Sequence, residues 1–206
     1  MLKKGYFITF EGTDGCGKTT QLELAKEYLE TQGFEVITTR EPGGQRLGCK
    51  LREILLHYDG VVSSNCELFL YLADRAQHID TVVKPALARG AIVLCDRHTD
   101  STVAYQGYGR GIDIEKLNKL NELATSGLKP DLTLLFDVSL ETGQSRVGKE
   151  KDRLESEKDE FHINVRNGYL ELAKQNPERI KILNAELSIE RVFEGTLNAI
   201  KTLLNS

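Results

Sequence analysis

Short apolar runs alternate along the chain with longer segments in which apolar residues recur at helical spacing. The apolar runs cover residues 6–10, 35–39, 91–95, 132–136 and 180–183. Their length and their β-branched and aromatic content predict buried strands, and the segments between them predict helices. This alternation of strand and helix predicts an α/β fold in which a parallel sheet is covered by helices on both faces.

Three segments between or after the strands carry more specific patterns. Residues 65–90 form a long mixed segment, where Pro85 predicts a kink or break near the end. The glycine-rich residues 107–111 predict a loop. The last helix has one apolar face, which we expect to face the core. That face consists of Ile189, Val192, Phe193, Leu197, Ile200, Leu203 and Leu204.

Composition limits the class of protein. The 206 residues suit a single domain spanning 1–206. A formal net charge of −4 argues against broad binding to nucleic acid or to an anionic membrane. The four cysteines show no C-x-x-C spacing, and neither a signal segment nor a long apolar span stands out. We therefore expect a cytoplasmic protein with free thiols and with no nucleic-acid or membrane partner.

The most informative polar segment follows the first predicted strand. It reads Gly12-Thr13-Asp14-Gly15-Cys16-Gly17-Lys18-Thr19 and matches G-x-x-x-x-G-K-[ST], and residues 20–32 after it predict a helix. Such a loop directs backbone N–H groups at phosphate, its lysine reaches the β- and γ-phosphates, and its threonine can ligate Mg²⁺. The segment predicts binding of a nucleoside triphosphate by these residues and Thr20.

Two further polar clusters follow predicted strands, where an open α/β sheet binds its ligands. They are residues 40–44 and 96–98. Asp96 is placed to hold Mg²⁺ opposite Thr19, while Arg97 and Arg40 can hold a second anion beside the triphosphate. Two fixed cations favour a phosphorylated acceptor over water. The alternative is that Asp96 and Arg97 form a structural ion pair.

Tyr71 and Arg75 lie four residues apart on a predicted helix and therefore share a face. An aromatic ring beside a guanidinium suits a flat base with an exocyclic carbonyl, such as a keto-pyrimidine or guanine. The alternative is that Tyr71 belongs to the core and Arg75 pairs with Asp74. Side chains that can hydrogen-bond a base follow at Ser101, Thr102 and Gln106.

Residues 144–160 are the most polar region of the chain. They interleave basic residues with carboxylates, which is typical of a solvated helical turn with local ion pairs. In a phosphoryl-transfer protein, a short, mobile basic lid is the alternative.

Taken together, these motifs resemble the thymidylate kinases of bacterial type, a family of P-loop nucleoside-monophosphate kinases. The matching motifs are residues 10–19, 40–44, 73–75, 84–87, 96–98, 101–102, 104–107, 110–111, 129–133 and 152–155. The resemblance implies the three-layer P-loop NTPase fold with five parallel strands, a homodimer, Mg-ATP as donor and dTMP as acceptor.

On the donor side, the resemblance implies that Lys18 and the loop amides hold the ATP phosphates, with Thr19 and Asp96 on the metal. Arg146 is similar to the family residue that packs on adenine. Eukaryotic relatives have an arginine inside the phosphate loop, which is missing here, so the charge of the transition state must be neutralised from elsewhere. Since two basic lid positions are lysines, we expect Arg153 to be the principal lid cation.

On the acceptor side, the resemblance implies that Arg97 and Arg40 bind the dTMP phosphate and that Asp14 accepts from the 3′-hydroxyl. Tyr71, which replaces the phenylalanine of many relatives, would stack on thymine, and Arg75 would donate to its O4. The remaining residues assigned to the base or sugar are Ser101, Thr102 and Gln106.

Two other function classes stay open from the residues. One is a kinase for a different monophosphate or a deoxynucleoside. The other is a switch NTPase with a protein partner, although the nearest segment to a guanine-specific N-K-x-D element, residues 118–121, ends in asparagine. A separate hypothesis makes Cys16 reactive, because a thiol at a helix N-terminus can have a lowered pKa.

Overall fold

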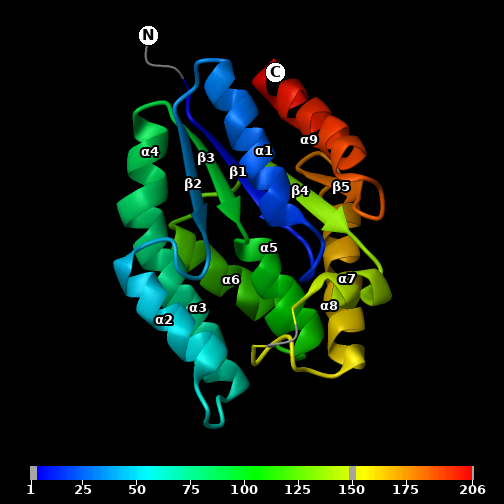
Figure 1. Ribbon diagram of the computed structural model, residues 1–206. Coiled ribbons are helices and arrows are strands. Elements are labelled where there is room, and N and C mark those ends of the chain that lie inside the picture. The colour runs from blue at the N-terminus through cyan, green and yellow to red at the C-terminus, as the bar shows by residue number, and fades with distance from the viewer. Residues whose placement is uncertain (1–3, 149–151, 206) are drawn as a thin grey trace.

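The computed structural model describes residues 4–148 and 152–205. Its centre is a sheet of five parallel strands in the order β2-β3-β1-β4-β5 (Figure 1). The strands are β1 (Tyr6–Glu11), β2 (Val36–Arg40), β3 (Ile92–Asp96), β4 (Leu132–Asp137) and β5 (Ile180–Asn184). Each lies within one residue of its predicted run, so the predicted parallel α/β sheet is confirmed.

The helices alternate with these strands along the chain. They are α1 (Lys18–Thr31), α2 (Arg46–His57), α3 (Ser64–His78), α4 (Lys84–Ala88), α5 (Thr99–Thr102), α6 (Ile114–Thr125), α7 (Leu140–Arg146), α8 (Asp159–Gln175) and α9 (Ile189–Leu204). Two π-helical segments, η1 (Ile79–Val83) and η2 (Val103–Gly109), continue α3 and α5.

Alternate residues of the central strand enter different cores. Ile8 and Phe10 pack in the layer that holds α1 and α9. Phe7, on the opposite face, packs with η1 and α4. Successive side chains of a strand point to opposite faces, so near-continuous apolar runs are what a sheet covered on both sides requires. Figure 1 shows α1 and α9 together on one side of the sheet.

The predicted loop at 107–111 is wrong for its first three residues, which belong to η2. Gly109 is needed for packing, because a Cβ there would approach the Phe161 ring of α8 to 2.6 Å.

The helical segment does not end at the break predicted near Pro85. Its hydrogen bonding changes from α to π over Ile79–Val83, and Pro85 then lies in the first turn of α4, where proline is tolerated.

The last helix follows its predicted pattern except at its start. Val192 and Ile200 are buried in the core. Ile189, expected on the same face, is 54% exposed and lines a cavity beside the phosphate loop.

The four cysteines are free, as expected. Within the described ranges, no helix is both long and apolar enough to cross a membrane.

Candidate active site

The phosphate loop joins β1 to α1 and depends on glycine for its shape. Gly12, Gly15 and Gly17 have φ values of 144°, 76° and 83°. A Cβ at Gly15 would also collide with the carbonyl oxygen of Gly143 in α7. These conformations favour glycine and let the backbone turn tightly ahead of the positive end of α1. Lys18, the first residue of α1, is 7% exposed.

Arg97 joins this loop to a neighbouring cavity. Its Nη1 donates to the Gly12 carbonyl at 3.0 Å, and its Nη2 donates to Asp14 Oδ1 at 2.6 Å. Its guanidinium also lies over the Tyr105 ring, 5.0 Å from the centroid. The proposed structural pair of Asp96 with Arg97 is therefore wrong, since the carboxylate that Arg97 contacts is Asp14.

Asp14 is kept ionised by its cationic neighbours. Burial acts to raise its pKa, but Arg97 and Lys18 outweigh that effect and hold the pKa of Asp14 well below its usual range. Lys18 Nζ lies 3.8 Å from Asp14 Oδ1. Asp14 therefore only accepts hydrogen bonds at neutral pH, which suits it to accept from a sugar hydroxyl.

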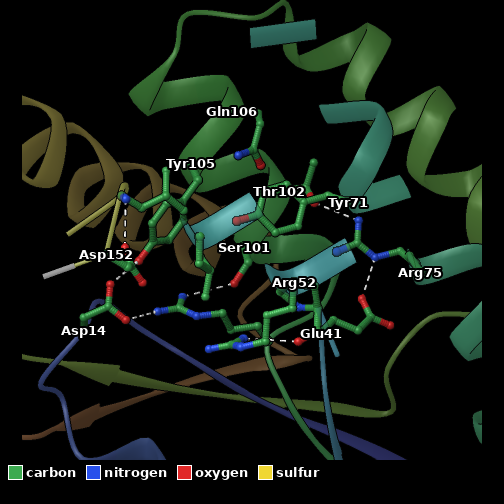
Figure 2. A pocket seen from close by; sticks show the side chains of 14 residues that line it. Asp14, Glu41, Arg52, Tyr71, Arg75, Ser101, Thr102, Tyr105, Gln106 and Asp152 are labelled. Carbon is green, nitrogen blue, oxygen red and sulfur yellow. Dashed lines mark hydrogen bonds and ion pairs between the residues drawn. The ribbon is translucent and has the colours of Figure 1, made fainter. Parts of the chain in front are cut away.

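A cavity opens beside Arg97, and most of the residues predicted for the acceptor line it (Figure 2). The predicted members are Asp14, Tyr71, Arg75, Arg97, Ser101, Thr102 and Gln106. They come from the phosphate loop, from α3, from the end of β3 and from the α5–η2 segment. Arg52, Tyr105 and Asp152 also line the cavity. No role is assigned to them from the sequence, although the matching motifs 104–107 and 152–155 contain Tyr105 and Asp152.

Arg75 is fixed at the edge of this cavity by four acceptors. Its Nε donates to Glu41 at 2.7 Å, its Nη1 to Thr102 and Asn121, and its Nη2 to the His98 carbonyl. A guanidinium has five N–H donors, so one on Nη2 is left for a ligand. The alternative pairing of Arg75 with Asp74 is wrong, because its carboxylate partner is Glu41.

Ser101 contacts Arg97 and supports its position. Its hydroxyl donates to Glu11 at 2.5 Å and lies 3.4 Å from Arg97 Nη1, which also donates to Tyr169. Burial, helped by the nearby carboxylate of Asp100, raises the pKa of Glu11 to about 7. Glu11 and Tyr169, to which no role is assigned from the sequence, thereby help to position the Arg97 guanidinium, Tyr169 directly and Glu11 through Ser101.

Arg40 is not brought into the acceptor cavity. It lies in a separate depression with Thr19 and Asp96. Arg52 of α2 takes a place in the acceptor cavity, where its Nη1 donates to the Pro42 carbonyl at 3.1 Å. Contact of Arg40 with the dTMP phosphate stays a prediction.

The depression that holds Thr19 and Asp96 has the donor set that Mg²⁺ prefers, a hydroxyl and a carboxylate. Asp96 Oδ1 is buried and has no hydrogen-bond partner within the described part of the chain. A buried carboxylate oxygen normally has a partner, so this one fits a site for a cation or its water.

A second cavity runs from the phosphate loop toward the start of α9. Residues 15–21 line one side, and Arg146, Ala185 and Ile189 are among those on the other. Arg146 Nη1 donates to the Ala185 carbonyl at 3.0 Å, which holds the guanidinium along this wall. The arrangement suits the predicted packing of Arg146 on a base.

Glu41 provides a test of how the acceptor cavity is held together. We expect Glu41→Gln to lower the free energy of unfolding by about 3 kcal/mol, because it leaves the buried charge of Arg75 without a counter-charge. Burial acts to raise the pKa of Glu41, but His98 and Arg75 outweigh it and the pKa is lowered well below 4.5. The stabilisation is therefore present above pH 4.5 and lost as the pH falls through the folded-state pKa.

Urea denaturation at several pH values measures this effect. Glu35→Gln is the matched control, because Glu35 also pairs with an arginine, Arg89, at 2.7 Å but at the surface. We expect a much smaller loss there. Equal losses in the two variants would contradict a supporting role for Glu41.

Comparison with known proteins agrees with this geometry. The family model described as thymidylate kinase matches residues 10–195. The chain belongs to the thymidylate kinase family. It is 47% identical to the thymidylate kinase of Geotalea daltonii, over 98% of this chain and 99% of that one, and 54% identical to that of a Synechococcus species, over 87% and 86%. A crystal structure of thymidylate kinase from Ehrlichia chaffeensis superposes with a TM-score of 0.80 at 36% identity, covering 96% of this chain and 99% of that chain.

Within the thymidylate kinase fold, Arg153, the arginine expected to act as lid cation, lines neither of the two cavities. Arg153 Nε donates to the Leu55 carbonyl at 2.9 Å, and Nη2 lies 2.6 Å from Glu67 Oε2. The two basic positions Lys149 and Lys151 lie outside the described residues. Arg153 must leave Glu67 before it can reach the phosphate loop, so its role as lid cation stays a prediction.

Cys16 packs as a small core residue of this kinase. It is 3% exposed and belongs to the cluster that holds β1 and α1. Burial raises the pKa of the Cys16 thiol. Because thiolate is the reactive form, the direction is opposite to the one that the reactive hypothesis needs.

Proposed function

We propose that this chain is a thymidylate kinase that transfers the γ-phosphate of Mg-ATP to dTMP, giving dTDP for dTTP synthesis. The observation that carries the proposal is the position of Arg97. One guanidinium contacts both the Gly12 carbonyl of the phosphate loop and the Asp14 carboxylate on the wall of the acceptor cavity. It therefore lies where a phosphate of each nucleotide must approach the other.

The donor and acceptor occupy opposite sides of Arg97 in this proposal. Amides of residues 12–20 and Lys18 bind the ATP phosphates, and Arg146 packs on adenine. Tyr71 stacks on thymine, the free N–H of Arg75 donates to O4, and Asp14 accepts from the 3′-hydroxyl. Arg52, which the sequence did not suggest, binds the dTMP phosphate together with Arg97, since both line the acceptor cavity.

The chemistry needs no side-chain base. A phosphate monoester is largely ionised near neutral pH, so its oxygen can attack the γ-phosphorus in line, and catalysis comes from positioning and charge neutralisation. Thr19 and Asp96 would hold Mg²⁺, which neutralises charge on the β- and γ-phosphates when bound. Arg97 and Lys18 supply fixed positive charge from the protein.

We propose a cytoplasmic homodimer of one kinase domain per chain, with a lid over residues 144–160. Three adjacent helices expose apolar side chains that a second copy would cover. Ile54 of α2, Phe69 of α3 and Leu123 of α6 are 44%, 59% and 78% exposed. Covering such side chains is a common driving force of association.

Product analysis tests the proposed function. The protein is mixed with Mg-ATP and, separately, with dTMP, dUMP, UMP or thymidine, and the nucleotides are separated by chromatography. We expect dTMP to have the highest kcat/KM and ADP to appear only with an acceptor. Preference for thymidine would indicate a deoxynucleoside kinase, and acceptor-independent hydrolysis would indicate a switch NTPase.

A further inference from the structure

Glu67 of α3 is a buried carboxylate directly behind the base end of the acceptor cavity. Its side chain is 1% exposed and does not line the cavity. Gln106 of η2 lies between Glu67 and the cavity, and its Nε2 donates to Glu67 Oε1 at 3.0 Å. Figure 2 shows Gln106 beyond Thr102 on the wall of the cavity.

Two arginines keep Glu67 charged. Arg110 Nε and Nη2 lie 3.3 Å and 3.2 Å from Oε1 and Oε2, and Arg153 Nη2 lies 2.6 Å from Oε2. Burial acts to raise the pKa of Glu67, but hydrogen bonds from Arg110 and Gln106 outweigh it, and the pKa is lowered. An ionised carboxylate accepts hydrogen bonds and donates none.

The negative charge of Glu67 determines which end of the Gln106 side-chain amide faces the cavity. The NH₂ group must face Glu67, so the carbonyl Oε1 is left over, and it has no hydrogen-bond partner among the residues that the structure describes. We propose that Glu67, which touches no substrate, sets the base specificity by holding Gln106 with its carbonyl oxygen available to the base. Glu67 is thus a positioning residue, and this inference rests on the proposed function.

The expected preference follows from the chemistry of the bases. Thymine and uracil carry a hydrogen on N3, which can donate to Gln106 Oε1. Cytosine has a lone pair at N3, which would face the same oxygen. A site built around one hydrogen-bond direction rejects the base with the opposite direction, because buried polar groups are then left unpaired.

Replacing the Glu67 carboxylate by an amide should reverse the orientation of the Gln106 side-chain amide. In Glu67→Gln, Arg110 Nη2 and Arg153 Nη2, which both lie against the Oε2 position, still require an acceptor, so the carbonyl oxygen of the new amide takes that position. Its NH₂ group then faces Gln106, whose Oε1 rotates inward to accept. Gln106 now offers a donor to the cavity, which suits N3 of cytosine.

The test compares kcat/KM for dTMP and dCMP in wild type and three variants. We expect Glu67→Gln to lower the ratio of dTMP to dCMP by about ten-fold or more. Glu67→Asp keeps an acceptor-only group and should keep the ratio, even if both substrates become slower. Glu157→Gln is the matched control, because Glu157 pairs with Arg110 Nη1 at 2.6 Å without touching Gln106. It should also keep the ratio.

An unchanged ratio in Glu67→Gln, or an equal loss in Glu67→Asp, would overturn the inference. If Glu67→Gln fails to fold, NMR of the wild-type protein tests the orientation of the Gln106 amide instead. We expect the Gln106 Nε2 hydrogens to show nuclear Overhauser contacts to the Glu67 side chain in the dTMP complex, and contacts from them to thymine instead would overturn it. Failure of the proposed function is separate, because wild type would then not phosphorylate dTMP.

Discussion

Arg97→Ala should lower kcat/KM for dTMP by about 10³-fold or more, the range found for arginines that neutralise a transferring phosphoryl group. The variant loses the guanidinium that contacts Gly12 and Asp14 at once. It also removes the charge that allows two phosphates to approach each other. Steady-state kinetics with both substrates varied measures the loss, and circular dichroism with thermal unfolding shows whether the fold is retained.

Arg89→Ala is the control for removing an arginine. Arg89 pairs with Glu35 at the surface and is about half exposed, with 47% of its side chain accessible. Loss of such a pair has a small effect, so near-normal kinetics are expected. Wild-type rates in Arg97→Ala would exclude the position of Arg97 as the basis of the proposed function.

Lys18→Ala is expected to lower kcat by about 10²- to 10³-fold, the usual effect of removing one preorganised group that stabilises transition-state charge. Lys18 begins α1 and is buried beside Asp14, so its ammonium is fixed in direction before ATP arrives. Single-turnover kinetics at saturating ATP separates this effect from weaker binding. Lys26→Ala, about two turns further along α1, should retain wild-type turnover, and an equal loss there would point to damage to the helix.

The strands and most helices could be predicted because buried elements of a parallel sheet leave a strong pattern. Residues 132–136 are apolar at nearly every position, since both faces of β4 are covered. The prediction of a loop at 107–111 was wrong for residues 107–109 because their conformation depends on a long-range contact and not on a local pattern. Glycine is typical of turns, but at 109 it allows η2 to approach Phe161, a long-range contact that local sequence does not reveal.

The site shows the same division between local and long-range information. The phosphate loop is a continuous motif and could be predicted in full. Arg75 lines the same cavity as the other residues predicted for the acceptor, but its partner Glu41 could not be predicted. Glu41 is 34 residues away from Arg75, whereas adjacent helical residues such as Asp74 and Arg75 do not face each other. Arg52 and Tyr105 lie in helical segments whose orientation toward the cavity depends on the packing of α2 and η2.

Arg40 illustrates how a strand end limits such predictions. The sequence places it at the carboxyl edge of the sheet, where ligands bind, and the structure agrees. The sequence does not determine the direction in which a long side chain leaves an exposed strand end. In the structure, Arg40 lines the depression with Thr19 and Asp96, whereas Arg97 lines the acceptor cavity.

The central claim is that one continuous site holds both nucleotides with their phosphates facing each other across Arg97. A compound that joins adenosine and thymidine through a chain of five phosphates tests it most directly, by isothermal titration calorimetry and by competition. We predict one molecule bound per chain, more tightly than ATP or dTMP alone because the two halves are tethered, and displacement by either nucleotide. Two molecules bound per chain, or displacement by only one of the nucleotides, would contradict the account.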